Sequence, residues 1–160
     1  MKNTVKLFLF LSLFAFMRMN AQKPSVYKIN DLLKRIHNNS DTTYVVNFWA
    51  TWCKPCVAEL PDFEKFHSDY KSKNVKVILV SMDFVEELDK RLKEFLEKNK
   101  YTCEVVLLDE INGNDFINKI SETWSGAIPA TLITGKKRSK DHFQEGKMTY
   151  EALTKAVVEK

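Results

Sequence analysis

Two cysteines separated by two residues carry the clearest chemistry in this 160-residue sequence. Cys53 and Cys56 lie in the segment NFWATWCKPC, which is residues 47–56. The thiolate is the reactive form of cysteine. A Cys-x-x-Cys pair at a helix start favours it, because unpaired backbone N–H groups and the helix dipole stabilise the anion. Such a pair could exchange disulfides, bind a soft metal ion or form a structural disulfide.

The residues on either side of the pair favour the redox alternative. Residues 43–50, TYVVNFWA, are a nearly continuous β-branched and aromatic run, which predicts a strand buried on both faces. After Cys53, apolar residues recur at helical spacing at Val57, Leu60, Phe63, Phe66 and Tyr70. A strand that leads into Cys-x-x-Cys and a helix that follows it are typical of a redox motif.

The metal and structural alternatives have less support in the sequence. Structural zinc has four ligands, commonly from a second Cys-x-x-Cys or a His pair, and here His37, His67 and His142 are scattered. Two thiolates suit copper(I), so a copper(I)-binding metallochaperone that uses Cys53 and Cys56 stays open as the alternative function. A structural disulfide across so short a loop would constrain the chain little.

The rest of the chain alternates predicted strands with predicted helices. Strands are predicted at residues 26–29, 43–50, 75–82, 104–108, 130–134 and 141–145. Helices are predicted after an Asn30 cap, after Cys53, and at residues 86–100, 113–123 and 149–159. This order predicts an α/β protein with a mainly parallel sheet and helices on both faces. The last two strands are too close for a crossover helix and should form an antiparallel hairpin.

The first 21 residues have the layout of a secretory signal peptide. Lys2 and Lys6 precede the apolar run LFLFLSLFAFM at residues 7–17, and the segment ends on the small residue Ala21. The run is shorter than the roughly 20 residues that span a membrane, so an uncleaved N-terminal anchor is the less favoured alternative. We therefore expect a signal peptide at residues 1–21 and an exported domain at residues 22–160.

The remaining charge and cysteine content predict no second site. The chain has 25 Lys and Arg against 21 Asp and Glu residues, and three of the basic residues belong to the leader. The domain that follows is nearly neutral, and no basic patch predicts nucleic-acid binding. Cys103 stands at the start of a predicted buried strand, and we interpret it as an inert core residue.

Two segments resemble the thioredoxin superfamily, and more narrowly the exported thiol–disulfide oxidoreductases of the TlpA/ResA type. They are NFWATWCKPCVAELP at residues 47–61 and AIPATLI at residues 127–133. The resemblance covers residues 24–160. It implies a thioredoxin-like α/β fold with a central mixed β-sheet flanked by helices and no cofactor. The helix and strand predicted within residues 86–108 match the extra helix–strand insert of this branch.

The resemblance also implies roles for the residues around the cysteine pair. Cys53 would be the exposed nucleophile and Cys56 the buried resolving cysteine of a redox-active disulfide. Pro129 would be cis and lie against the pair, with Ile128 offering its backbone to an extended substrate. Trp52 would be partly exposed beside Cys53, as a second substrate contact.

Glu59 and Trp124 each keep two interpretations. Thioredoxins carry a buried Asp where this chain has Asn47, and an amide cannot take up a proton. In the TlpA/ResA branch the candidate base is the Glu of the pattern C-x-x-E-x-P, which here is Glu59, one helical turn beyond Cys56. Its other interpretation is a salt-bridged or solvated helix residue. Trp124 either packs near the site or is ordinary aromatic core.

The resemblance implies thiol–disulfide exchange. Whether the protein reduces or oxidises its substrates depends on the redox potential of the cysteine pair. Relatives of this type mostly reduce disulfides in periplasmic proteins, apocytochrome c among them, and receive electrons from a membrane donor. The expected partners are therefore disulfide-containing proteins and such a donor. A binding module that keeps the fold without turnover is a further class, and the intact Cys53/Cys56 pair argues against it.

Overall fold

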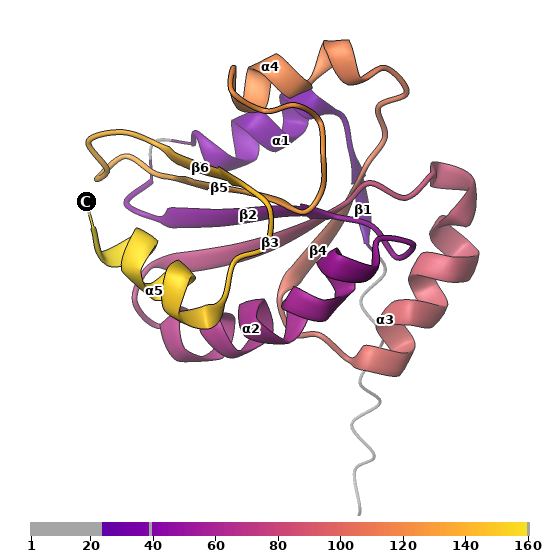
Figure 1. Ribbon diagram of the computed structural model, residues 1–160, viewed down its shortest axis with the longest axis horizontal. Helices are drawn as coiled ribbons and strands as arrows, with labels where there is room; N and C mark the ends of the chain where they lie inside the picture. Colours follow the sequence, from indigo (N-terminus) through magenta and orange to yellow (C-terminus); the bar gives the residue numbers. More distant parts are fainter. Residues whose placement is uncertain (1–23, 39, 160) are drawn as a thin grey trace, which may run out of the picture.

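The computed structural model describes residues 24–38 and 40–159 of the chain. They form a six-stranded sheet with helices on both faces (Figure 1). The predicted signal peptide at residues 1–21 lies outside the described residues. Within the described ranges, none of the helices has the length and apolar character needed to cross a membrane.

The sheet is mixed and has the strand order β1-β4-β3-β2-β5-β6. Its strands are β1 (Ser25–Tyr27), β2 (Thr43–Trp49), β3 (Val75–Ser81), β4 (Glu104–Leu108), β5 (Ala130–Thr134) and β6 (His142–Glu145). The first four in this spatial order, β1, β4, β3 and β2, run parallel, whereas β5 is antiparallel to both β2 and β6. The predicted mixed sheet and its terminal hairpin are confirmed.

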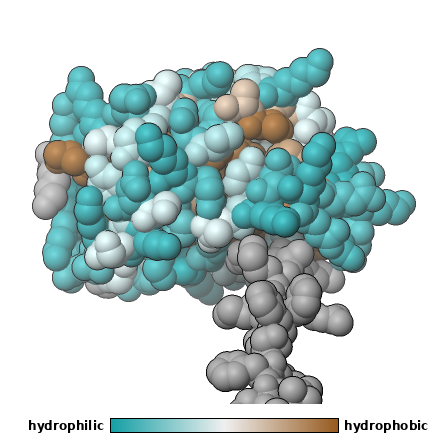
Figure 2. Space-filling view, turned by 90° about the horizontal axis from the view of Figure 1, so that it is seen from below, coloured by the Kyte–Doolittle hydropathy of each residue, from teal (hydrophilic) through white to brown (hydrophobic). Residues whose placement is uncertain are grey.

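Each face of the sheet is covered by its own set of helices and has its own apolar core. On one face lie α2 (Lys54–Tyr70), η2 (Leu88–Leu92), α3 (Lys93–Asn99) and α5 (Tyr150–Val158). The other face carries α1 (Ile29–Ile36) and α4 (Ile117–Ile120). Side chains along β2 alternate between the cores, as a strand requires, with Val45 on the α2 side and Val46 on the α1 side. Seen from below the view of Figure 1, the outer surface is mainly hydrophilic (Figure 2).

The expected helix–strand insert is present, but its helix is not one regular α-helix. A 3₁₀ turn, η1 (Val85–Glu87), leads into a π-helical segment, η2, and only then into α3. Leu88, Leu92 and Leu96 are buried together. Steps of four residues overshoot an α-helical turn of 3.6, and the wider π turn offsets the resulting drift. The strand that follows, β4, lies inside the sheet between β1 and β3.

The start of α1 differs from the prediction. The strand predicted at residues 26–29 ends at Tyr27, and α1 begins at Ile29 with Lys28, not Asn30, as its N-cap residue. The reason is a distant contact: the backbone N–H of Ile29 donates to Oε1 of Glu110 at 2.8 Å. This bond provides the partner that a capping side chain would otherwise supply.

The helix predicted at residues 113–123 is also wrong in extent. It consists of a 3₁₀ turn, η3 (Gly113–Asp115), and the short α4, which ends at Ile120. Ser121 has extended backbone angles, and its hydroxyl accepts the N–H of Thr123 at 3.3 Å. This local side-chain hydrogen bond competes with helix continuation. Phe116 and Ile120 are buried, as predicted.

Candidate active site

The cysteine pair lies where β2 passes into α2. Cys53 is the N-cap residue of α2 and forms a disulfide with Cys56, one turn into the helix. The backbone N–H of Cys56 donates to Sγ of Cys53 at 3.3 Å. Cys53 is 6% exposed and Cys56 is fully buried. Cys53 is therefore the more exposed of the two cysteines, although it is less exposed than the resemblance implied. The helix N-terminus stabilises negative charge on its sulfur after reduction.

A loop before β5 lies directly against the disulfide. The Ile128–Pro129 peptide bond is cis, as the resemblance implied. Sγ of Cys53 lies 3.8 Å from the carbonyl oxygen of Ile128. The backbone N–H of Gly146 donates to the carbonyl of Pro129 at 2.8 Å and ties the loop to the end of β6. A polypeptide that binds along Ile128 would therefore pass beside the Cys53 sulfur.

Trp124 fixes the conformation of this loop. Its indole N–H donates to the carbonyl of Ala127 at 2.8 Å. Its ring is buried against Phe48 and Phe143, with centroid separations of 4.8 and 5.9 Å. Both interpretations of Trp124 therefore hold: it is core packing, and through Ala127 it also positions the loop beside the disulfide.

A carboxylate that the sequence analysis did not single out supports the same loop. Glu145, the last residue of β6, accepts the backbone N–H of Ser125 at 2.9 Å and its hydroxyl at 2.8 Å. Gly126, which follows, has a φ of 90°, a left-handed conformation that favours glycine. The sequence signal was weak, since residues 125 and 145 meet only through the β5–β6 hairpin.

We expect Trp124→Phe to weaken substrate binding and leave the redox equilibrium unchanged. The variant keeps a ring in the core but removes one hydrogen bond, which contributes about 0.5–1.5 kcal/mol. This free energy corresponds to a rise of roughly 2–12-fold in the KM for a protein disulfide. Steady-state kinetics and a redox titration measure the two quantities.

Trp49→Phe is the matched control. The indole nitrogen of Trp49 is buried and has no hydrogen-bond partner among the described residues, so this change removes a similar volume without removing a bond. An equal rise in KM for both variants would show that ring volume, not the bond from Trp124 to Ala127, sets the loop.

Glu59 lies in the core beneath the site, bonded to Asn47. It is 1% exposed, so it is not a solvated helix residue. Its carboxylate accepts Nδ2–H of Asn47 at 2.8 Å and the backbone N–H of Met148 at 2.8 Å. Asn47 also donates to Oγ1 of Thr131 at 3.2 Å. The residue that replaces the thioredoxin Asp therefore contacts the candidate base directly.

Burial makes Glu59 a weak acid. It raises the pKa of this carboxyl to about 7, and the N–H groups of Met148 and Asn47 oppose the rise only in part. A pKa near neutrality allows a group both to take up and to release a proton at physiological pH. Cys56 lies one helical turn before Glu59 in α2.

A second buried carboxylate, Asp83, holds the segment that leads into Cys53. It accepts the backbone N–H of Thr51 at 3.1 Å, the Thr51 hydroxyl at 2.6 Å and the Ser81 hydroxyl at 2.7 Å. The sequence analysis did not single it out. The sequence signal that could have identified Asp83 is a polar residue just after a buried strand, because functional sites usually form at the carboxyl edge of such a sheet.

Cys103 is placed as the sequence analysis predicted, in the core. Its thiol donates to Oε2 of Glu64 at 3.0 Å. Burial raises the pKa of this thiol well above its usual range, and the Glu64 carboxylate raises it further. Cys103 therefore stays a thiol and does not compete with Cys53 as a nucleophile.

The chain has the features of a thioredoxin-fold protein: the mixed sheet, the disulfide at the start of α2 and the cis-proline loop beside it. It belongs to the AhpC/TSA family, whose family model matches residues 24–139. The resemblance to the ResA type is confirmed by the relatives described next. Within the described residues, no cluster of three or more His, Cys, Asp or Glu side chains could hold a metal ion.

Two relatives illustrate the similarity in sequence. Sporulation thiol-disulfide oxidoreductase A of Bacillus subtilis is 29% identical over 115 residues, covering 72% of this chain and 66% of the relative. Thiol-disulfide oxidoreductase ResA of Oceanobacillus iheyensis is 28% identical over 137 residues, covering 69% of this chain and 71% of the relative. The chain thus spans about two thirds of the length of these relatives.

Two solved structures show the same fold. The crystal structure of StoA from Bacillus subtilis matches with a TM-score of 0.57 and 26% identity, covering 74% of this chain and 84% of StoA. The thioredoxin-related protein from Neisseria meningitidis serogroup B matches with a TM-score of 0.64 and 25% identity, with the same coverage.

Proposed function

We propose that this protein is a thiol–disulfide oxidoreductase that reduces disulfides in other proteins through Cys53 and Cys56. The observation that carries the proposal is the Cys53–Cys56 disulfide at the N-terminus of α2, with Cys53 the more exposed of the two residues. The names of the two relatives, both thiol-disulfide oxidoreductases, support the same reaction class.

The reaction is an exchange in two steps. The Cys53 thiolate attacks one sulfur of the substrate disulfide; that S–S bond breaks, a mixed disulfide forms, and the first substrate thiolate leaves and takes up a proton. The Cys56 thiolate then attacks the Cys53 sulfur, so the mixed disulfide breaks and the second substrate thiolate leaves and is protonated. Two electrons pass from the cysteine pair to the substrate, and a dithiol donor must reduce the pair again.

Glu59 is proposed to handle the proton of Cys56. Cys56 is fully buried and cannot lose its proton directly to water. A carboxylate one turn further along α2, with a pKa raised to about 7 by burial, is a suitable acceptor and can return the proton in the reverse direction. Asn47 holds this carboxylate from β2.

The substrate is proposed to bind across Trp52, Ile128 and Pro129. Trp52 is more than half exposed beside Cys53, and the Ile128 carbonyl lies 3.8 Å from the Cys53 sulfur. An extended peptide on this surface would present its disulfide to Cys53 between an aromatic ring and exposed backbone.

We further propose that the protein acts after export. The leader-like residues 1–21 support this, with residues 22–160 as the mature thioredoxin-like domain. In the periplasm the substrates would be proteins whose cysteines must stay reduced, with apocytochrome c as one candidate, and a membrane protein would supply the electrons.

Insulin reduction and an equilibrium titration against glutathione test the proposed function together. The oxidised protein, reduced by dithiothreitol, should accelerate insulin reduction. In glutathione buffers its pair should become reduced only at a high ratio of glutathione to glutathione disulfide, as for a reductant. A pair that is reduced more easily than glutathione disulfide would indicate an oxidant. Stoichiometric copper(I) binding without insulin reduction would select the metallochaperone instead.

A further inference from the structure

A cavity lies at the amino edge of the sheet, which is the edge where the parallel strands begin. Its volume is about 360 Å³, and its walls include Ser25 of β1, Lys76 of β3 and the end of α2. The end of α2 contributes His67 and the C-cap residue Lys71. Lys71 and Lys76 form no ion pair with another described residue. The buried Nδ1 of His67 has no hydrogen-bond partner among them either. The cavity therefore holds basic groups whose charge is not neutralised by a neighbour.

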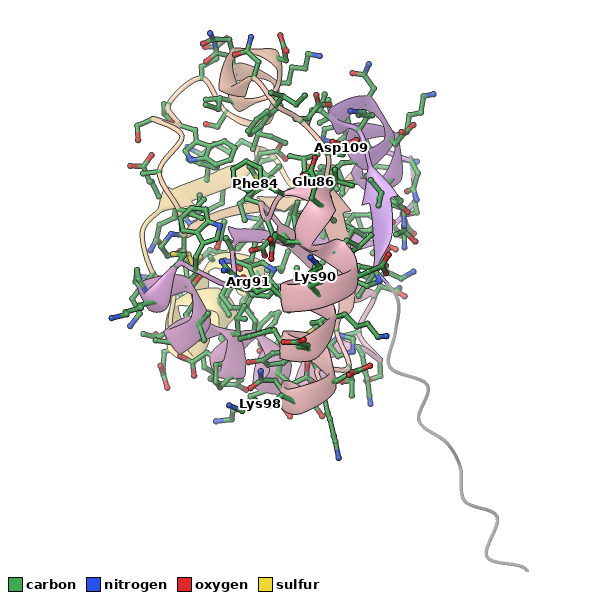
Figure 3. All side chains as sticks on the ribbon, turned by 90° about the vertical axis from the view of Figure 1, so that its right-hand side faces the viewer. Phe84, Glu86, Lys90, Arg91, Lys98 and Asp109 are labelled. Atoms are coloured by element: carbon green, nitrogen blue, oxygen red, sulfur yellow. A yellow bond between two sulfur atoms is a disulfide. The ribbon has the colours of Figure 1, made fainter. Side chains whose placement is uncertain are left out.

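Two lysine-rich segments of the chain meet at this cavity. Residues 71–76, KSKNVK, contain three lysines, residues 98–103, KNKYTC, contain two, and neither segment has an acidic residue. The first segment lines the cavity with Lys71 and Lys76, and the second lines it with Thr102. All five lysines are exposed, and Figure 3 shows Lys98 at the lower end of the column formed by η1, η2 and α3. The sequence alone did not reveal this basic surface, because only the pairing of β3 with β4 brings the two segments together.

The negative groups around the cavity are too few to cancel the charge of these lysines. Glu104 is the carboxylate among the lining residues, and Arg35 pairs with it at 3.0 Å. Glu64, which accepts the backbone N–H of Thr102 at 2.9 Å, contributes one negative charge. The carboxyl end of α2 adds roughly half of another. Because five lysines face these charges, the surface around the cavity stays positive and should attract anions.

We propose that residues 71–76 and 98–103 bind the phosphate groups of an anionic lipid surface, with one phosphate in the cavity beside Lys71 and Lys76. Lysine binds phosphate as a point charge, and a cluster of several lysines is attracted to anionic lipids. The described part of the chain starts at the same edge, since Ser25 lines the cavity. The apolar run at residues 7–17, typical of a leader that enters a membrane, precedes it in the sequence. A membrane is therefore favoured over a free anion as the source of the phosphate.

Binding through this surface would also orient the redox site. β2 and β3 run parallel from the amino edge, with Thr43 opposite Val75 at one end and Trp49 opposite Ser81 at the other (Figure 1). A strand of this length spans roughly 20 Å at about 3.3 Å per residue. Cys53 follows the far end of β2, so a bound domain presents its disulfide away from the lipid. Salt weakens attraction between exposed charges, so the association is reversible and the domain can also turn toward a membrane electron donor.

Sedimentation of the 160-residue chain with lipid vesicles tests this surface. The wild type should bind vesicles of phosphatidylglycerol and phosphatidylcholine in equal parts more tightly than vesicles of phosphatidylcholine alone. Lys71→Gln/Lys76→Gln should weaken binding to the phosphatidylglycerol vesicles roughly 25-fold, since each lysine near an anionic surface contributes about fivefold. Lys71→Arg/Lys76→Arg keeps both charges and should bind as the wild type does. Every variant carries the same residues 1–21, so the differences between variants report the two segments.

Lys54→Gln/Lys119→Gln is the matched control, because it removes the same charge elsewhere. Lys54 follows Cys53 at the redox site, and Lys119 lies in α4, on the face of the sheet opposite α2 (Figure 1). This control should bind the vesicles as the wild type does, and Lys71→Gln/Lys76→Gln should reduce insulin at the wild-type rate. An equal loss of binding in both double variants, or no loss in Lys71→Gln/Lys76→Gln, would overturn the lipid surface and leave the reductase function intact.

Three further results separate the alternatives. A wild type that binds inorganic phosphate in calorimetry but does not sediment with vesicles would overturn the lipid surface and assign the cavity to free phosphate. A wild type that binds a DNA duplex and no vesicles would assign the lysines to nucleic acid instead. Failure of the wild type to reduce insulin, with vesicle binding as expected, would overturn the proposed function alone.

Discussion

Replacing Cys53 with serine abolishes disulfide reduction if the proposed mechanism is correct. A serine hydroxyl has no anion at neutral pH, so the first attack on the substrate cannot occur, and insulin reduction should fall to the uncatalysed rate. Among the described cysteines, the remaining thiols cannot replace it: Cys56 is fully buried, and burial raises the pKa of Cys103 well above its usual range. Retention of the wild-type rate by Cys53→Ser would rule out the exchange mechanism.

Cys56→Ser should stop the same reaction one step later. Without the resolving thiolate, the mixed disulfide between Cys53 and the substrate cannot collapse and should accumulate. Non-reducing electrophoresis and intact mass would detect this adduct, and dithiothreitol would release it. Cys103→Ser is the control and should keep the wild-type rate. A Cys56→Ser protein that forms no adduct would place the resolving role elsewhere.

Replacing Glu59 with glutamine should remove a pH dependence from both catalysis and stability. In the wild-type protein, with the pKa of Glu59 raised to about 7 by burial, the rate of exchange should change around neutral pH. A glutamine cannot carry the Cys56 proton, so the variant should be slower and lose that inflection. Stopped-flow measurement of thiol–disulfide exchange between pH 5 and 9 checks this, and an unchanged profile would remove Glu59 from the mechanism.

The same substitution should stabilise the protein above pH 7 relative to the wild type. The Glu59 pKa is raised from 4.5 to about 7 in the folded protein, so between these values the folded state holds one more proton than the unfolded state. Stability therefore falls as the pH rises through this window, by about 3 kcal/mol at 1.36 kcal/mol per pKa unit. Urea unfolding of the oxidised wild type and Glu59→Gln at pH 5 and pH 8 should show this difference.

The environment of Glu59 suits a glutamine. The glutamine carbonyl can accept the Met148 N–H. Its amide can donate to the side-chain oxygen of Asn47, which has no hydrogen-bond partner among the described residues, once the Asn47 amide turns over so that this oxygen replaces the Nδ2–H group facing residue 59. Glu64→Gln is the control from the same helix. Burial would raise the pKa of Glu64, but hydrogen bonds donated by Thr102 and Cys103 lower it. The contribution of Glu64 to stability is therefore lost only as the pH falls below 4.5. The difference between wild type and Glu64→Gln should therefore stay constant from pH 5 to pH 8.

Local patterns were sufficient for the site's central elements. The buried run that forms β2 and the apolar spacing after Cys53 are properties of neighbouring residues. The bounds of β2 and α2 agree with the predicted strand and helix to within one residue. Predictions were wrong where a contact with a residue distant in the sequence determines the local structure. Glu110 sets the start of α1, although it stands 81 positions from Ile29. The register of Leu88, Leu92 and Leu96 against the sheet favours a π turn that no local propensity predicts.

The sequence by itself determined which groups could react: the Cys53/Cys56 pair, the helix that begins at it, and Glu59 as a carboxyl one turn beyond. Spacing along one helix is a local property, so these assignments need no tertiary contact. Only the tertiary structure decided what surrounds that chemistry. It buries Glu59 against Asn47 and so raises the Glu59 pKa, brings Ile128 to the Cys53 sulfur, and uses Asp83 to hold Thr51, two residues before Cys53. Burial and contacts between strands arise when the sheet assembles, and for that reason they could not be read from the sequence.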